Sequence, residues 1–225
     1  VRFPARREWN MNLATYFAVC IFLSQEDKIE NKKCGDKAMT FYIDTRYANC
    51  SREICRLLKA CILEQTREWS EIIFLCIGTD RVTGDCLGPY IGAQLSSHAF
   101  PMVHVYGTLS APVHALNLTD TMQEIQKRHP GSLIIAIDSS LGQKKHLGYV
   151  TISNGALYPG AAVHKKLPPV GHIHITGIVN VSGVLEHLTL QTTRLSTVIS
   201  IADQITDGIL YMIPLISKCG FIQIL

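Results

Sequence analysis

The sequence predicts an α/β protein in which helices cover both faces of a mostly parallel sheet. From residue 70 to residue 216, apolar runs of strand length alternate with amphipathic segments of helical spacing, and this order is typical of the class. The runs at 71–77, 133–137 and 173–179 are apolar over most of their length, as expected for strands that are buried on both faces. With 225 residues, the chain is long enough for one sizeable core.

Ahead of residue 70, the sequence predicts a helix, a loop, a short strand and a second helix. The apolar run at 13–23 is too short to cross a membrane, which takes about 20 residues, so we expect a buried N-terminal helix rather than a signal peptide or a span. Residues 24–38 are polar and charged, which is typical of a loop, and 41–43 form a short strand. In 51–68 apolar residues recur at helical spacing, and Ser51 is a suitable capping residue.

Between residues 71 and 216, strands and helices alternate. The strand at 71–77 leads through a glycine-rich loop into a helix at 85–97, and His129-Pro130-Gly131 ends a later helix. No linker divides this region, so we expect an N-terminal extension (1–70) packed on one α/β domain (71–225). The same criteria predict strands at 102–106, 133–137, 149–152 and 173–179, helices at 119–128, 182–190 and 195–216, and a proline-containing loop at 154–171.

Charge and cysteine usage argue against several classes of protein. The 21 basic and 18 acidic residues give a net charge of +3, which is too small to indicate a nucleic-acid partner, and we expect no membrane partner either. None of the eight cysteines belongs to a Cys-x-x-Cys pair, which argues against a zinc ribbon. A chain of this size does not need disulfides, so we expect reduced thiols in a cytosolic protein.

Two acidic residues stand where apolar strands are predicted to end. Asp85 follows the strand at 71–77 through the glycine-rich loop, and Asp138 directly follows the strand at 133–137. Because ligands bind at the carboxyl ends of parallel strands, we expect both carboxylates at one site, suited to acid/base chemistry, metal binding or both. The alternative is structural: Asp85 caps the following helix, and Asp138 is a hydrogen-bonded buried acid.

The loop that contains Asp85 does not match the known nucleotide-binding loops. Asp85 stands where a P-loop needs lysine, and the Gly-x-Gly-x-x-Gly pattern is absent. Its neighbour Cys86 is either a nucleophile activated by a helix N-terminus or a small residue in the first helical turn. His172 and His174 share one face of a strand by alternation, so they either bind a metal or belong to a polar surface or loop contact.

Eight sequence blocks occur in order between residues 71 and 205 and resemble one family. They resemble the YyaC-type sporulation proteins, which are described as spore proteases. That family is similar to the germination protease, which degrades small acid-soluble spore proteins, and more distantly to hydrogenase maturation proteases. The resemblance implies a three-layer α/β/α fold. The blocks are Gly78–Pro89, Val105–Leu109, Pro112–Ala115, Ile135–Asp138, Leu141-Gly142, Pro159-Gly160, Leu167–Gly171 and Ile175–Gly183.

The resemblance also implies a reaction, an endopeptidase that uses paired aspartates. Asp85 falls on the aspartate of the germination protease segment Thr-Pro-Asp-x-Leu-Gly-Pro, and Asp138 falls on the aspartate that ends an Ile-Asp strand. Two such carboxylates can share a proton and activate a water molecule. The supporting loop residues are Gly78, Thr79, Asp80, Gly84 and Gly88, of which Asp80 orients rather than reacts.

The same comparison suggests a third site residue and a set of partners. Hydrogenase maturation enzymes add a histidine and engage a metal, and His164 falls near that position. No cofactor is required, and the alternative is a divalent metal held by Asp85, Asp138 and His164. The expected partner is a protein or peptide substrate, such as a small acid-soluble spore protein, in the cytoplasm of a mother cell or forespore. The competing hypothesis is a non-catalytic sporulation factor that binds a peptide or protein on the same fold.

Overall fold

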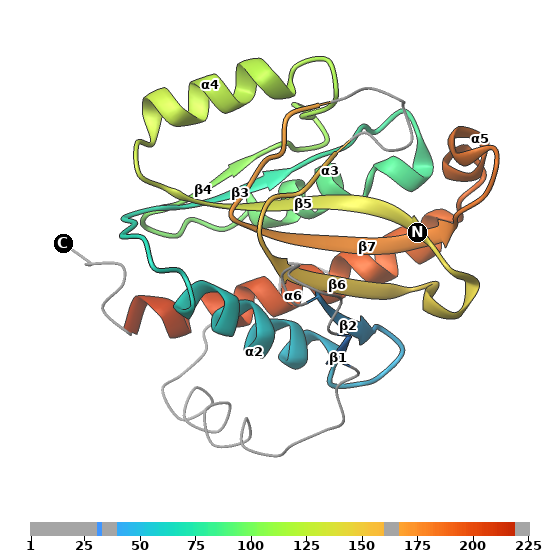
Figure 1. Ribbon diagram of the computed structural model, residues 1–225, viewed down its shortest axis with the longest axis horizontal. Coiled ribbons are helices and arrows are strands. Elements are labelled where there is room, and N and C mark those ends of the chain that lie inside the picture. The colour runs from blue at the N-terminus through green and yellow to red at the C-terminus, as the bar shows by residue number, and fades with distance from the viewer. Residues whose placement is uncertain (1–30, 33–39, 160–166, 219–225) are drawn as a thin grey trace.

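The computed structural model shows one sheet with helices above and below it (Figure 1). The helix predicted at 13–23 and the candidate site residue His164 lie outside the part of the chain that the structure describes. The described residues are 31–32, 40–159 and 167–218.

Seven strands form the sheet in the order β1-β2-β6-β7-β5-β3-β4. Strands β4, β3, β5 and β7 pair in parallel, in that order. Strand β6 pairs antiparallel with β7, β2 pairs antiparallel with β6, and β1 pairs antiparallel with β2. Five strands therefore share one direction, and the predicted mostly parallel sheet is confirmed. The strands are β1 (Asn31–Lys32), β2 (Thr40–Asp44), β3 (Ile72–Cys76), β4 (Val103–Tyr106), β5 (Leu133–Gly142), β6 (Tyr149–Asn154) and β7 (Ile173–Val181).

The described helices lie in two layers, one on each face of the sheet, which confirms the three-layer α/β/α arrangement. Helices α2, α3 and α6 pack together and cover one face, and α4 lies above the other face in Figure 1. The short α5 packs beside the loop that contains Asp85. The helices are α2 (Cys50–Leu63), α3 (Leu87–Leu95), α4 (Leu118–Arg128), α5 (Glu186–Gln191) and α6 (Leu195–Lys218).

Strand β3 explains why the sheet needs helices on both faces. Ile72, Phe74 and Cys76 pack into the core beneath α2, α3 and α6. Ile73 and Leu75 pack into the second core, beneath α4. Because successive side chains of a strand point to opposite faces, a strand that is apolar at every position is stable only between two apolar layers.

Helix α6 is the one helix of the described residues that is long and apolar enough to cross a membrane by length and composition. Its residues Ile201, Ile205 and Ile209 are buried in the core, and the helix packs against α2 and α3. The hydrophobicity of α6 therefore has a structural explanation within the fold. Among the described cysteines, Cys50, Cys61, Cys76 and Cys86 are buried thiols that fill the same core.

Four predicted element boundaries were wrong. Helix α2 ends at Leu63, shortly before the polar segment Gln65-Thr66-Arg67-Glu68. Strand β1 interrupts the loop that was predicted at 24–38. Helix α3 begins at Leu87, after a 3-10 turn at Thr83–Asp85. The helix predicted from Ser182 is only α5.

The most consequential difference concerns β5, which does not end at Asp138. The strand continues to Gly142 because β7 pairs with it along this whole length, with Asp138 opposite Thr176. Pairing between neighbouring strands outweighs the low strand preference of an acidic residue. Asp138 is therefore held inside a rigid strand rather than at its frayed end.

Candidate functional site

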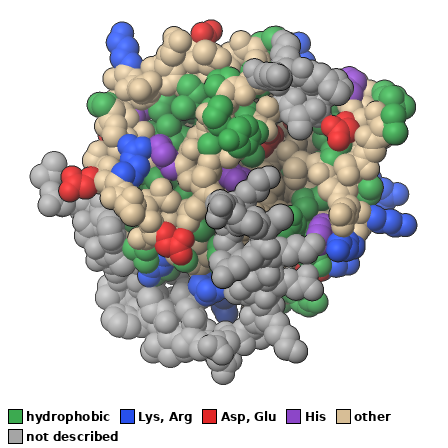
Figure 2. All heavy atoms as spheres, viewed as in Figure 1, with side chains coloured by type: hydrophobic (Ala, Val, Ile, Leu, Met, Phe, Trp, Pro, Cys, Tyr) green, Lys and Arg blue, Asp and Glu red, His purple; other side chains and the backbone are tan. Residues whose placement is uncertain are grey.

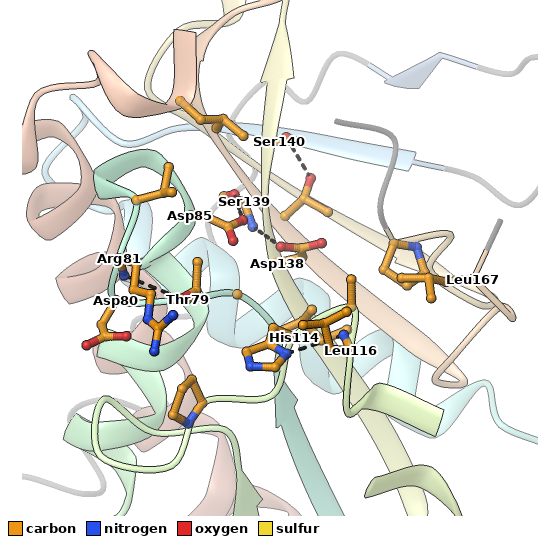
Figure 3. A pocket seen from close by; sticks show the side chains of 18 of the residues that line it. Thr79, Asp80, Arg81, Asp85, His114, Leu116, Asp138, Ser139, Ser140 and Leu167 are labelled. Atoms are coloured by element: carbon orange, nitrogen blue, oxygen red, sulfur yellow. Dashed lines mark hydrogen bonds between the residues drawn. The ribbon is translucent and has the colours of Figure 1, made fainter. Parts of the chain in front are cut away.

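A cavity of about 880 Å³ opens at the carboxyl edge of the parallel strands. Figure 3 shows that the side chains of Asp85 and Asp138 project toward the same space, with His114 and Leu116 on the opposite side. The structure thus brings together the two acidic residues that the sequence analysis placed at one site. The polar lining residues include Thr79, Asp85, His114, Asp138 and Thr176.

Main-chain contacts fix the position of Asp85. The backbone N–H of Thr79 donates to the Asp85 carbonyl at 3.0 Å, and the N–H of Gly78 donates to Val113 at 2.8 Å. Gly78 has a φ of 140°, and a Cβ added there would lie 2.0 Å from the Asp85 carbonyl oxygen. Only glycine fits at this position. Gly88 is restricted in the same way, because its added Cβ would lie 2.1 Å from the Ile77 carbonyl oxygen.

Strand β5 presents Asp138 from the opposite wall, and Ser139 connects the two acids. The backbone N–H of Ser139 donates to Asp138 Oδ1 at 2.7 Å. The Ser139 hydroxyl donates to Asp85 Oδ1 at 3.4 Å. One residue therefore contacts both carboxylates, one through the main chain and the other through the side chain (Figure 3).

Burial raises the pKa of both carboxyl groups. The pKa of Asp85 rises to about 6, opposed by hydrogen bonds from Ser139 and Thr79 and by the charge of His114. The pKa of Asp138 is raised well above its usual value, first by burial and then by the nearby Asp85. Two close carboxyl groups do not both ionise readily. Of the two groups, Asp85 therefore ionises more readily, and Asp138 more readily keeps its proton.

A row of hydroxyl groups continues from Asp138 across the sheet. Thr176 lies opposite Asp138 on β7, and Thr151 lies opposite Thr176 on β6. The Thr176 and Thr151 hydroxyl oxygens are 2.7 Å apart, and the Ser140 hydroxyl donates to Thr176 at 3.4 Å. The sheet is therefore polar around Asp138, whereas the amino-terminal half of β5 is entirely apolar.

Of the other loop residues that the sequence analysis named, some line the cavity and some do not. Thr79 and the exposed Asp80 line the cavity. Gly84 does not line it: an added Cβ there would lie 2.8 Å from Leu190, so Gly84 allows α5 to pack closely. The alternative in which Asp85 caps a helix is wrong, because α3 begins after Cys86 without a side-chain cap.

Of the two alternatives for Cys86, the structure supports a small, buried residue, which directly precedes the first turn of α3. Its thiol donates to the Thr83 carbonyl at 3.1 Å, and it does not line the cavity. Burial raises the pKa of this thiol, which is the opposite of what an activated nucleophile requires.

His172 and His174 form structural contacts rather than a metal site. The Nδ1 atom of His172 accepts a hydrogen bond from the Ile134 N–H at 3.0 Å, and its other ring nitrogen contacts Arg67. His174 bonds to the Gly155 carbonyl at 3.0 Å. The interpretation of these two residues as polar loop contacts is therefore confirmed.

The cavity contains functional candidates that the sequence analysis did not single out. His114 lies across from the acids and affects the pKa of Asp85. Leu109, Leu116 and Tyr158 line the cavity and are 40%, 76% and 75% exposed. The sequence offered one clue to His114, because this residue lies in the short Pro112–Ala115 block, to which no role was assigned. It offered no clue to Thr176, because a threonine within a buried strand is common.

A metal in this cavity would need a third ligand besides the two carboxylates. Among the residues that the structure describes, Asp85 and Asp138 belong to no group of three His, Cys, Asp or Glu side chains close enough to share an ion. The predicted third residue, His164, lies outside the described residues.

Comparisons with known proteins identify the family of this chain. A family model described as "Protein of unknown function (DUF1256)" matches residues 42–208, which include the whole Asp85–Asp138 region. The chain is 43% identical over 168 residues to "Uncharacterized protein YyaC" of Bacillus subtilis (strain 168), and the alignment covers 75% of this chain and 81% of that relative. The predicted resemblance to YyaC-type proteins is confirmed. Neither description names an activity.

Proposed function

The chain belongs to the family described as "Protein of unknown function (DUF1256)", and we propose that this member hydrolyses peptide bonds with the Asp85–Asp138 pair. The observation that carries the proposal is the pairing itself. Two carboxyl groups from different segments line one cavity, and burial raises the pKa of both. Perturbed carboxyl groups that differ in protonation at neutral pH are suited to act as a general base and a general acid.

The roles of the two acids follow from their ionisation. Asp85, with a pKa of about 6, is ionised at pH 7 and takes a proton from water. The water oxygen bonds to the peptide carbonyl carbon while protonated Asp138 donates its proton to the carbonyl oxygen. When the C–N bond breaks, Asp85 gives its proton to the departing amine, and the hydroxyl proton of the intermediate returns to Asp138. Both acids end the cycle in their starting states.

The walls of the cavity suit an extended peptide. Leu109, Leu116 and Tyr158 expose large apolar surfaces beside the acids, and exposed apolar groups of this size commonly mark binding sites. Figure 2 shows hydrophobic side chains gathered below α4, with acidic and basic side chains dispersed around them. These surfaces supply contacts for apolar side chains on either side of a scissile bond.

We place this activity in the cytoplasm during sporulation, with small acid-soluble spore proteins as the first substrates to test. The support is the family resemblance and the relative from Bacillus subtilis. The competing function is a non-catalytic factor that binds a peptide in the same cavity. Its support is the same apolar wall, which holds a peptide whether or not the acids react.

The test is incubation of the purified full chain with small acid-soluble spore proteins, followed by mass spectrometry of the products. The matched variants are Asp85→Asn, Asp138→Asn and Asp44→Asn, the last of which changes a carboxylate outside the cavity. We expect cleavage by the unchanged chain and by Asp44→Asn, and none by the two cavity variants. Binding without cleavage by the folded chain would favour the binding factor. Loss of cleavage with a chelator would move the mechanism to a metal.

A further inference from the structure

A second cluster of titratable side chains lies at the opposite edge of the sheet from the cavity. Glu71 directly precedes β3, His104 lies in β4, and His129 directly follows α4. Figure 1 shows the end of α4 and the beginnings of β3 and β4 on the side of the molecule opposite α5. One potential ligand atom from each of the three residues lies within 4.8 Å of the other two.

The polar atoms of this cluster are incompletely satisfied. The Nε2 atom of His104 is buried and has no hydrogen-bond partner among the residues that the structure describes. It points toward Glu71, whose Oε2 atom is 3.7 Å away. A buried polar atom without a partner is unfavourable, so its presence calls for an explanation. A bound ion between His104 and Glu71 would supply the missing partner.

His129 is already oriented as a metal ligand would be. Its Nδ1 atom lies 2.6 Å from Glu71 Oε2, and its Nε2 atom lies 3.1 Å from the Tyr106 hydroxyl. Metal-bound histidines characteristically hydrogen-bond through the ring nitrogen that does not ligate, which fixes the ring. Tyr106 provides that second contact here.

We propose that Glu71, His104 and His129 bind a divalent transition-metal ion, with Zn²⁺ as the ion of best fit. Two imidazole nitrogens and one carboxylate oxygen form a ligand set that Zn²⁺ uses in proteins, with water completing the tetrahedron. Ligand atoms about 2.0–2.1 Å from a tetrahedral ion lie about 3.4 Å apart. The 3.7 Å separation of His104 and Glu71 is close to this value, whereas His129 and Glu71, now 2.6 Å apart, would have to move apart by about 0.8 Å on binding.

The surroundings are compatible with an ion. Arg128, the cation next to His129 in the sequence, is paired with Glu124 at 2.7 Å. The ion would join the starts of β3 and β4 to the end of α4. Its effect is on stability, and it is independent of the peptidase proposal.

The experiment is thermal unfolding of the chelator-treated full chain with added Zn²⁺, together with calorimetric titration. We expect one ion per chain and a Tm increase of about 5–10 °C when free Zn²⁺ is 100 times its Kd. His104→Gln should abolish the increase. The matched control is His98→Gln, on the exposed turn after α3, where the ring contacts only Ser97, Gln94 and Phe100 among the described residues. It should keep the full increase.

Co²⁺ provides a readout that does not depend on stability. Loading with Co²⁺ should give the visible bands of a tetrahedral site without a thiolate charge-transfer band in the near ultraviolet. A thiolate band would assign the ion to cysteine, and a Tm increase retained in His104→Gln would place it elsewhere. Either result overturns the proposal, as does a titration without binding. Should His104→Gln fail to fold, Glu71→Gln replaces it with the same expected loss.

Discussion

Asp44 and Asp85 are two carboxylates at the same edge of the sheet with opposite electrostatic surroundings. Asp44 ends β2, and the Arg46 guanidinium donates to both of its oxygens, at 2.8 Å and 2.5 Å. These hydrogen bonds lower the pKa of Asp44. Among the described residues no guanidinium is hydrogen-bonded to Asp85, and burial raises its pKa to about 6. Burial alone therefore does not set the pKa of a carboxyl group, because the partner decides whether the charged form is stabilised.

The largest expected difference between the two regions is in catalysis. Asp85→Asn and Asp138→Asn should each lower kcat/KM by a factor of about 10²–10⁴, because each removes a proton-transfer group. Asp44→Asn should leave kcat/KM unchanged. The measurement is the steady-state rate on a cleaved peptide, with circular dichroism to verify folding. An equal loss of kcat/KM in Asp44→Asn would contradict a catalytic role that is specific to the two cavity acids.

The next largest effect is on the free energy of unfolding, and it concerns a glycine in the main chain beside each acid. Gly78→Ala should lower the free energy of unfolding by about 3 kcal/mol or more, since the new Cβ meets the Asp85 carbonyl oxygen. Gly148, beside Asp44, has a φ of 82° but only Thr45 Oγ1 at 3.7 Å from an added Cβ. Gly148→Ala should therefore lower stability by only about 1–2 kcal/mol.

Urea unfolding of both glycine variants measures the difference. The loss in free energy of unfolding should be greater for Gly78→Ala than for Gly148→Ala by at least about 1 kcal/mol. Both glycines have a positive φ, but only at Gly78 does the new Cβ collide with the backbone. Equal losses would mean that the loop shifts freely around Asp85, and the acid would then not be held in place by its main chain.

Asp85→Asn should raise stability at neutral pH, by about 1–3 kcal/mol. A carboxyl group whose pKa is higher in the folded protein than in the unfolded chain destabilises the fold as pH rises. Here the penalty appears above about pH 4 and is complete above about pH 6. Unfolding at pH 3.5 and pH 7 should show a gain only at pH 7. A loss of stability at pH 7 would instead indicate a structural role for the carboxylate.

Asp44→Asn should have the opposite sign and the smallest effect. The lowered pKa of Asp44 stabilises the fold above about pH 4, and this contribution disappears as pH falls through the folded-state pKa. Because the Arg46 side chain is 72% exposed, solvent screens the pair, and the expected loss at pH 7 is about 1 kcal/mol. The same two-pH unfolding experiment measures it, and a gain in stability would contradict the assigned ion pair.

The sequence analysis located the cavity acids because parallel strands impose a simple geometry. Asp85 and Asp138 both follow buried apolar runs, and such runs end at one edge of the sheet. The prediction that Asp138 terminates its strand was wrong, because pairing with β7 is a tertiary effect that the local sequence does not contain.

Features that depend on packing between distant segments could not be predicted. Ser139 contacts Asp85 only because a loop and a strand meet there, and Gly84 reflects the approach of Leu190 from α5. The cluster of Glu71, His104 and His129 comes from three separate elements. No spacing along the chain relates such residues, so only the folded arrangement reveals them.

The most direct test of the proposed chemistry is the pH dependence of kcat/KM for the unchanged chain, from pH 4 to pH 9, on a peptide from a cleaved spore protein. We predict a rate that rises about tenfold per pH unit below about pH 6, as Asp85 ionises, and that falls again once the pH is high enough for Asp138 to lose its proton. A rate that does not change between pH 4 and pH 6, or a folded chain that cleaves no peptide at any pH, would contradict the two-aspartate mechanism.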